Sequence, residues 1–299
     1  MWIDAVEKVF KKTADSGFPM KYIKSISVSG QQHGLVALDS SGNLARTMAK
    51  LWNDFSTQEE CDLLTEKMGG NDNMISETSN TQRTGYTAAK IYHMYRHERD
   101  IYNNTHILFL VHNYINWYLT GGVAVMEPGD TSGTALWNPA TQNWSTDLIS
   151  VIDLDLAEKL PKVKSSTESI GTISKSLAER FGFSTECKID AGSGDNMYGA
   201  IGTGNVKPGI VTVSLGTSGT AYTFLEKPYV DPEGEIASFC DSTGNYLPLL
   251  CVSNLANGFD EFCRINNLSP RQFDELISET EPGNDGRILI PWYEGERTP

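Results

Sequence analysis

Basic residues are scarce in this chain of 299 residues, which holds 24 lysines and arginines against 38 aspartates and glutamates. The formal net charge is −14, whereas proteins that grip nucleic acid or an anionic membrane do so through clustered Lys and Arg. We therefore expect neither nucleic acid nor a membrane as a partner. An anionic ligand would have to be held locally, by backbone amides and a cation.

Paired cysteines are missing as well. The five cysteines are odd in number, widely spaced and free of any Cys-x-x-Cys pair, so the sequence predicts no disulfide framework, no zinc site and no metal-ligating residue. A reducing cytoplasm is the expected compartment. No segment has the length and apolarity of a membrane span, and the amino terminus does not have the pattern of a secretory signal.

Three enzyme motifs are absent too. The sequence has no Gly-Lys dipeptide, no GxGxxG run opening a helix, and no GxSxG elbow around Ser132 or Ser218. These absences argue against a P-loop nucleotidase, a Rossmann dehydrogenase and an α/β-hydrolase.

What is present is the composition of an ordinary globular chain, 39% hydrophobic and 21% charged, with strand-like and helix-like segments in alternation. This alternation predicts an α/β body, and Gly204 to Gly209 is the best candidate for a linker to a second domain. Trp2, Ile3, Val6, Val9 and Phe10 fall on one face of a helix. Strands are expected at 23–29, 35–38, 105–110, 186–190, 210–214, 220–224, 236–239, 246–250 and 288–292, and further helices at 57–68, 87–98, 113–119, 174–181, 196–201 and 255–265.

The most informative feature is the run Ser193-Gly194-Asp195-Asn196, followed by the turn Gly216-Thr217-Ser218-Gly219. The first places one carboxylate on a glycine-walled turn, and the second joins two strands and exposes backbone N–H groups to an anion. A base beside a phosphate cradle indicates phosphoryl transfer to a hydroxyl. Taken alone, Asp195 could instead bond its own backbone, and the second run could be a plain hairpin.

Six segments in order resemble the FGGY family of carbohydrate kinases, and Gln31-Gln32-His33-Gly34 is most similar to its xylulokinase branch. The resemblance implies an actin-like, RNase H-like α/β fold of two domains with the active site in the cleft between them. Residues 1–204 would form the sugar-binding domain without its first strands, and residues 205–299 the start of a truncated nucleotide-binding domain. The six segments are 29–34, 51–54, 127–134, 189–204, 211–219 and 295–299.

The resemblance also implies roles for individual residues. Asp195 matches the catalytic base, and ATP with Mg²⁺ is the implied phosphoryl donor. From residue chemistry alone, His33 could be a satisfied structural histidine, Trp52 a core residue and Arg83 a solvated loop residue. Sugar contacts are expected from Gln32, His33, Trp52, Asp54, Arg83 and Asn196, and ATP contacts from Gly216, Thr217, Ser218 and Gly219.

The chain departs from the family pattern in two places. Phe55 and Ser56 occupy a stretch where many members carry an Arg, which puts that sugar contact in doubt. His93 stands where a Trp is expected. His93 and His97 have the i, i+4 spacing of zinc-binding helices, but without a third ligand the pattern favours a solvated helix face.

The expected activity is ATP-dependent phosphorylation of a pentulose, D-xylulose to D-xylulose 5-phosphate in the first instance. The alternatives are another FGGY substrate, such as ribulose or gluconate, and a catalytically incomplete sugar-binding fragment; Gln32-His33 argues against glycerol. The family's initial Asp-x-Gly-Thr turn and final Gly-Gly adenosine segment are not found here, so we expect the chain to be a fragment of a longer protein. If these 299 residues are instead the complete chain, we expect no turnover. The sequence leaves a homodimer open.

Overall fold

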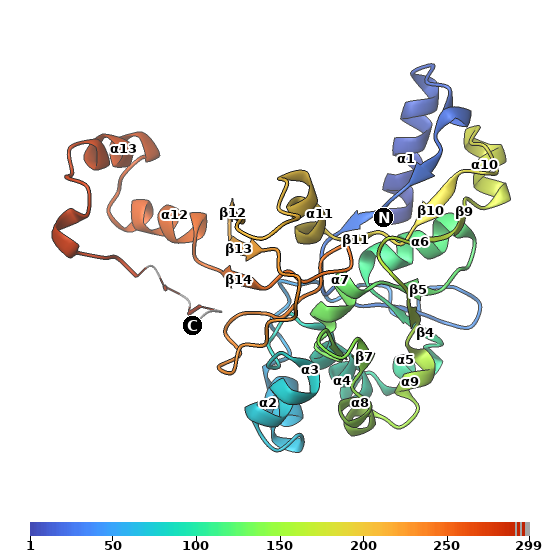
Figure 1. The fold of residues 1–299 in the computed structure, drawn as a ribbon, viewed down its shortest axis with the longest axis horizontal. Coiled ribbons are helices and arrows are strands. Elements are labelled where there is room, and N and C mark those ends of the chain that lie inside the picture. The colour runs from blue at the N-terminus through green and yellow to red at the C-terminus, as the bar shows by residue number, and fades with distance from the viewer. Residues whose placement is uncertain (291, 294, 297–299) are drawn as a thin grey trace.

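The computed structural model describes residues 1–290, 292, 293, 295 and 296. Arg297 to Pro299, the end of the last expected motif, lie outside the described residues, as does Pro291 of the expected strand at 288–292. In Figure 1 helices and strands alternate through the body, and the last two helices project from it. The helices are α1 (Trp2–Asp15), α2 (Gln58–Lys67), α3 (Asn71–Thr78), α4 (Thr87–His97), α5 (Arg99–Asn104), α6 (Val111–Thr120), α7 (Pro128–Thr131), α8 (Thr146–Ile152), α9 (Leu156–Lys159), α10 (Lys175–Phe181), α11 (Asp195–Gly202), α12 (Ala256–Ile265) and α13 (Pro270–Ser278).

The strands are short and form several small sheets. The sheet orders are β1-β10-β9, β11-β2, β12-β13-β14, β3-β4, β5-β8 and β6-β7. The strands are β1 (Ser25–Ile26), β2 (Ser29–Gly30), β3 (Val36–Leu38), β4 (Ile107–Phe109), β5 (Val125–Met126), β6 (Trp137–Asn138), β7 (Asn143–Trp144), β8 (Lys162–Val163), β9 (Ser169–Thr172), β10 (Lys188–Asp190), β11 (Ser193–Gly194), β12 (Val211–Leu215), β13 (Gly219–Thr223) and β14 (Leu249–Val252). None of the helices in the described part of the chain is both long enough and apolar enough to cross a membrane.

Helix α1 confirms the first expected amphipathic face. Phe10 packs edge-on against Phe181 and Phe183, with ring centroids 5.5 and 5.0 Å apart. Trp2, Ile3 and Val6 contact the same buried cluster as Phe10. Val9 was expected on this face, but it is exposed. It lies at the margin of the apolar stripe, where solvent reaches a residue of a surface helix.

The strand expected at 23–29 is two strands separated by Ser27 and Val28. β1 pairs with β10 and β2 with β11, both in parallel. Between β10 and β11, Gly192 adopts φ +74°, a conformation that suits glycine, and breaks the ladder while the Ser193 N–H still donates to the Val28 carbonyl at 3.1 Å. Because parallel strands end at the same edge, the residues after β2 and after β11 lie next to each other.

Downstream of residue 205, the hairpin β12-β13 confirms two expected strands, whereas the strand expected at 236–239 is wrong. Ala237 exchanges backbone hydrogen bonds with Leu249, but side chains bond the backbone beyond it: Asn80 accepts the Ser238 N–H at 2.8 Å, and Ser132 accepts the N–H of the following Cys240 at 3.0 Å. These bonds leave only isolated bridges to the neighbouring chain. The strand expected at 246–250 begins only at Leu249. Residues 288–290 are exposed and form no strand.

One buried cluster joins the body to the downstream segment. Tyr86, Ala135 and Met197 from the body pack with Tyr222 and Phe239 from beyond residue 205. The residues before and after the expected linker at 204–209 therefore pack against each other.

Candidate functional site

Asp195 begins helix α11 directly after the short strand β11. Its side chain reaches solvent, and its Oδ1 accepts the Asn196 backbone N–H at 3.0 Å. Its Oδ2 accepts no hydrogen bond from the part of the chain that the structure describes. The protein around the carboxylate removes water from it and raises its pKa; the Asn196 N–H works against this rise, and the Asp130 carboxylate adds to it. The local backbone bond that turn chemistry predicts is thus present, and one oxygen is left for another partner.

Gln32 and Asn196 form one contact between the two parallel strand ends. Asn196 Nδ2 donates to Gln32 Oε1 at 3.0 Å, and Thr220 Oγ1 on β13 lies 3.4 Å from Asn196 Oδ1. Gln32 is buried, and its Nε2 has no hydrogen-bond partner among the described residues. A buried amide N–H₂ without an acceptor costs free energy and is a natural contact for a hydroxyl oxygen of a ligand.

His33 is held from both its ring and its backbone. Nδ1 lies 2.7 Å from the Gly133 carbonyl, and the ring packs against Tyr86 at 4.8 Å between centroids. The residue has φ +64°, a strained value for a histidine, and Lys90 Nζ bonds its carbonyl at 2.8 Å. A Cβ on Gly133 would lie 2.6 Å from the His33 ring, so the loop fits this ring only with glycine.

A fully buried polar network lies beneath the Asp195 turn. Glu127 caps α7 by accepting the Gly129 and Asp130 N–H groups, each at 2.7 Å, and it also accepts the Ser193 hydroxyl at 3.1 Å. His112 Nδ1 lies 2.8 Å from Asp130 Oδ2. Burial works to lower the pKa of His112, but the hydrogen bond and charge of Asp130 outweigh it and raise the pKa; burial raises that of Glu127. The network ties the loop 127–134 to the strand that carries Asp195.

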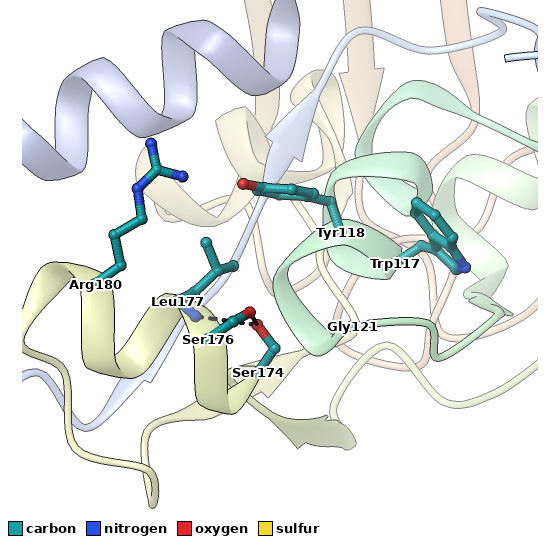
Figure 2. Close-up of a pocket in the computed structure, with 7 residues that line it drawn as sticks. All are labelled: Trp117, Tyr118, Gly121, Ser174, Ser176, Leu177 and Arg180. Carbon is teal, nitrogen blue, oxygen red and sulfur yellow. Dashed lines mark hydrogen bonds between the residues drawn. The ribbon is translucent and has the colours of Figure 1, made fainter. Parts of the chain in front are cut away.

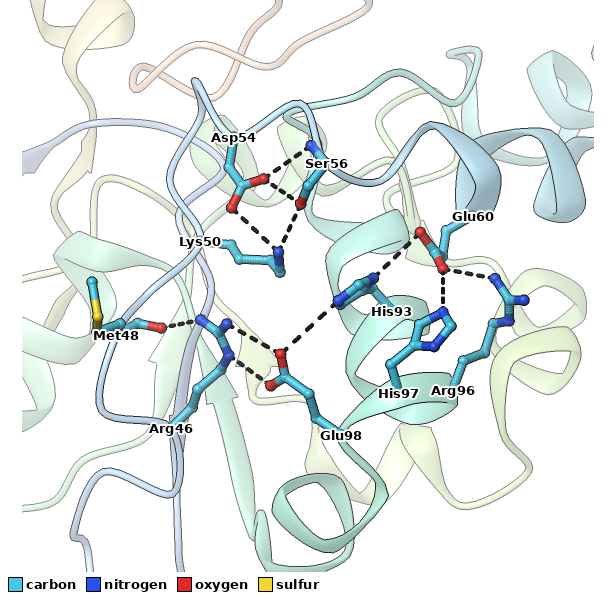
Figure 3. A network of polar contacts seen from close by, with 10 residues as sticks. All are labelled: Arg46, Met48, Lys50, Asp54, Ser56, Glu60, His93, Arg96, His97 and Glu98. Carbon is cyan, nitrogen blue, oxygen red and sulfur yellow. Dashed lines mark hydrogen bonds and ion pairs between the residues drawn. The ribbon is translucent and has the colours of Figure 1, made fainter.

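The other expected sugar contacts have protein partners. Asp54 forms an ion pair with Lys50 at 3.3 Å and accepts the Ser56 hydroxyl at 2.5 Å, as Figure 3 shows. Burial alone would raise the pKa of Asp54, but Ser56 and Lys50 lower it overall. Arg83 bonds the Thr81 hydroxyl and the Gly234 carbonyl, and Trp52 is half-buried.

The four expected ATP contacts form the turn between β12 and β13. Leu215 pairs with Gly219, and the Gly216 N–H donates to the Ser218 carbonyl at 3.1 Å. Thr217 is exposed at the tip, and the Ala256 N–H at the start of α12 donates to the Gly216 carbonyl at 3.2 Å. The turn is a tight hairpin against a helix N-terminus, which favours an anion nearby.

None of the expected site residues lines the hollow in Figure 2, which has a volume of about 300 Å³ and lies between α6 and α10. Its walls come from Trp117, Tyr118, Gly121, Ser174, Ser176, Leu177 and Arg180. It plays no part in the site described above.

The structure thus brings Gln32, His33 and Asn196 together around the Asp195 turn, with β13 alongside. Asp54 instead bonds Lys50 and Ser56 in its own loop, and Arg83 bonds Thr81 and the Gly234 carbonyl. Sequence reasoning missed the supports of this site. Lys90, fully buried within an apolar helix, was a signal that could have been read, since a lysine there needs a polar partner. Glu127 belongs to the matched segment 127–134, and the proline that follows it is typical of the first position of a helix, which is the signal that could have identified Glu127 as the cap of α7.

The comparisons with known proteins agree with one another. Residues 1–202 match the model of the FGGY family of carbohydrate kinases, N-terminal domain. The chain is 36% identical over its whole length to a xylulose kinase of Haemophilus influenzae, of which it covers 62%, and 33% identical to one of Streptomyces rubiginosus, of which it covers 58%. It therefore spans about 60% of the length of these curated relatives.

Solved structures give the same picture. All of the chain superposes on 60% of a protein from Brucella ovis titled a xyloylose kinase, with a TM-score of 0.90 and 27% sequence identity. A xylulose kinase from Bifidobacterium adolescentis follows with a TM-score of 0.83 and 25% identity, over 96% of this chain and 64% of that one. The mixed α/β architecture expected from the sequence is thereby confirmed.

Proposed function

Because this chain belongs to the FGGY family of carbohydrate kinases, we propose that it serves in the phosphorylation of a pentulose by ATP, with D-xylulose as the first substrate to test. The relatives named xylulose kinases support this choice of sugar. Because the chain spans only about 60% of the length of these relatives, the activity is proposed for the whole protein of which this chain would be a part. ATP is the donor used by the family, and the substrate rests on the similarity of the chain to those relatives.

The observation that carries the proposal is the contact of Gln32 with Asn196 beside Asp195. Two amide side chains from different strand ends meet at 3.0 Å, and the adjacent carboxylate keeps one oxygen without a hydrogen bond among the described residues. Amides bond vicinal hydroxyls, and a carboxylate within reach accepts the proton of the hydroxyl that reacts. We propose Gln32, His33 and Asn196 as sugar contacts, and Asp195 as the base.

Asp195 is suited to this role by its surroundings. Its raised pKa, which burial causes, makes the carboxylate a stronger proton acceptor than an ordinary aspartate. In the proposed step the sugar C5 oxygen bonds to the γ-phosphorus as the bond from that phosphorus to the β,γ-bridging oxygen breaks. The hydroxyl proton goes to Asp195, and ADP leaves with the bridging oxygen.

The nucleotide is proposed to meet the β12-β13 turn. Its exposed tip and the helix N-terminus behind it suit a phosphate, with Gly216 to Gly219 supplying backbone N–H groups and Thr217 a hydroxyl. Among the described residues no group of three metal-binding side chains is found around Asp195. We therefore propose that Mg²⁺ comes to the site with the nucleotide, as a charge that neutralises its phosphates.

Two roles remain weaker parts of the proposal. Asp54 would contact the sugar by exchanging its bonds with Lys50 and Ser56, and Arg83 by leaving the Gly234 carbonyl. The half-buried Trp52 would offer the sugar an apolar face. We keep 1–204 as the proposed sugar-binding domain and 205–299 as the proposed start of the nucleotide-binding domain.

The test is ADP formation dependent on D-xylulose, measured with this chain and with its natural parent if that is longer, alongside calorimetric binding of D-xylulose. D-ribulose, gluconate and glycerol serve as competing substrates. Asp195→Asn is expected to abolish turnover and keep sugar binding, Gln32→Ala to weaken binding, and the exposed Asp100→Asn to change neither.

The outcomes separate the alternatives. Turnover with D-xylulose that vanishes in Asp195→Asn supports the kinase and its base. Binding without turnover in either protein favours a sugar-binding role, and no binding of any sugar would sink both.

A further inference from the structure

A cluster of two histidines and a glutamate lies between helices α2 and α4. His93 and His97 stand one turn apart on α4, and Glu60 reaches them from α2. One possible ligand atom from each lies within 4.8 Å of the other two. The prediction of a solvated helix face is therefore wrong for His93. Its side chain is only 22% exposed, because α2 covers it. Tertiary packing supplies the third ligand that the sequence did not reveal.

The separations of the ligand atoms suit a small cation. Glu60 Oε2 lies 3.5 Å from His93 Nδ1, and Glu60 Oε1 lies 3.0 Å from His97 Nε2. Two ligands at about 2.0–2.1 Å from a tetrahedral Zn²⁺ stand roughly 3.3 Å apart. His93 Nδ1 is buried and has no hydrogen-bond partner in the described part of the chain. A buried nitrogen that faces a carboxylate and has no hydrogen-bond partner calls for an explanation, and a bound metal ion would provide one.

The groups behind the ligands have the arrangement of an outer coordination sphere. The far nitrogen of His93, Nε2, faces Glu98 Oε1 at 4.0 Å, and Arg46 holds Glu98 in place at 2.7 Å. At 4.0 Å this is an ion-pair distance and not a hydrogen bond, so Glu98 would act on the His93 ring through its charge, which raises the basicity of a histidine toward a metal. Arg96 Nη1 donates to Glu60 Oε1 at 2.7 Å, which leaves Oε2 as the oxygen free of hydrogen bonds from that arginine. Figure 3 shows both contacts.

Solvent reaches this cluster mainly through His97. The side chain of Glu60 is 2% exposed, whereas that of His97 is 45% exposed. The exposed side gives an entry path and room for a water as fourth ligand. Imidazole nitrogens with one carboxylate form a set of intermediate softness, which selects Zn²⁺ and similar divalent transition metals over Mg²⁺ or Ca²⁺.

We propose that Glu60, His93 and His97 bind one Zn²⁺ ion, which fastens α2 to α4. In Figure 1 these helices lie away from α11, which carries Asp195. His93 and His97 follow Lys90 on α4, and Lys90 bonds the His33 carbonyl, so the ion would be structural and would brace a helix that supports the sugar site. The proposal does not rest on the proposed kinase activity. The competing interpretation is an ion-pair network, in which the histidines neutralise Glu60 only when protonated.

The test is a titration of the metal-free chain with Zn²⁺ against a chromophoric chelator, with Co²⁺ as a spectroscopic probe. We expect one tight site, a rise in melting temperature with Zn²⁺, and a visible Co²⁺ spectrum without the band of a cysteine thiolate. His93→Gln and His97→Gln should each abolish tight binding, and Glu98→Gln should weaken it by about 10–100-fold. The matched control is His106→Gln, which removes an exposed histidine outside the cluster.

Each possible result either supports or overturns the zinc site. Binding lost in both cluster variants and kept in the control supports the site. If circular dichroism shows that His93→Gln does not fold, the more exposed His97→Gln carries the comparison alone. Absence of stoichiometric binding, unchanged affinity in His97→Gln, or a thiolate band with Co²⁺ would overturn the proposal.

Discussion

Asp195 combines a solvent-reaching side chain with a carboxylate whose charge the surrounding protein disfavours. Its backbone bond with Asn196 fixes one oxygen and leaves the other for a substrate. The same surroundings have a cost for folding. A carboxyl group whose pKa is higher in the folded chain than in the unfolded chain stabilises the fold only while it is protonated, and that contribution disappears as the pH rises through the folded pKa.

Replacing Asp195 with Asn therefore raises the melting temperature at pH 7, because an amide carries no charge to desolvate. The gain should shrink as the pH falls through the raised pKa, and be gone below the ordinary aspartate value of about 3.9. Melting curves followed by circular dichroism between pH 3 and pH 7 check this, with Asp100→Asn as control. A lower melting temperature at pH 7 would contradict the direction given for the pKa.

The buried Lys90 holds the backbone at His33 in place. Its Nζ bonds the His33 and Gly85 carbonyls inside the body. Lys90→Met leaves two buried acceptors without this donor, and we expect a loss of about 1–3 kcal/mol in the free energy of unfolding for each. Urea unfolding measures it. Lys11→Met removes an exposed pair with Asp15 and should stay within about 0.5 kcal/mol of the parent; equal losses in the two variants would refute the role.

At the scale of elements, the site depends on where two parallel strands end and on a loop that closes over them. β2 and β11 bring Gln32 and Asn196 together, and the loop after α7 holds the His33 ring against Gly133. Glu127 joins that loop to β11 through Ser193. The geometry of the site is thus set by short elements whose spacing leaves no room for added atoms.

Two glycine-to-alanine substitutions distinguish the steric requirement at the His33 ring from the ordinary gain in helix propensity. Gly133→Ala puts a Cβ 2.6 Å from the His33 ring, so the ring or the loop must move, and both stability and sugar affinity should fall. Gly202→Ala, at the end of α11, meets no atom within 4 Å and should stabilise by roughly 0.5–1 kcal/mol. Chemical unfolding and calorimetry of both variants check the contrast. Equal stability of the two would show that the loop accommodates the methyl group.

Across the whole molecule, the part of the chain from β13 to the start of β14 packs on the body, whereas α12 and α13 project from it. Phe239 is buried beside Tyr86 and His33, and Asn80 and Ser132 bond the backbone around it. Residues before and after position 205 therefore share a core. A change on one side should be felt on the other.

Phe239→Ala tests this coupling, because it empties a buried site between the two parts. We expect a loss of about 3–5 kcal/mol in the free energy of unfolding and weaker sugar binding through the displaced His33 ring. Tryptophan fluorescence and circular dichroism should report one shifted transition. Two separate transitions, with the upstream one unmoved, would show that the parts fold independently.

Local patterns in the sequence were enough for much of the fold. The apolar face of α1, apart from Val9, the helix expected at 174–181 and the hairpin turn at Gly216 to Gly219 are each decided by neighbouring residues, and all are confirmed. The order of the motifs was enough for the family, which the comparisons confirm. Asp195 and its partners remain predictions about chemistry.

Only the tertiary structure decided which distant groups meet. Residues 236–239 look like a strand, yet Asn80 accepts the Ser238 N–H and Ser132 accepts the N–H of the following Cys240, so that the pairing with 247–249 is reduced to isolated bridges. His93 and His97 look like a solvated pair, yet α2 brings Glu60 against them. The physical reason is the same in both cases: hydrogen bonds and ligand contacts depend on separations of a few ångströms, and packing sets those separations between segments that are far apart in the chain.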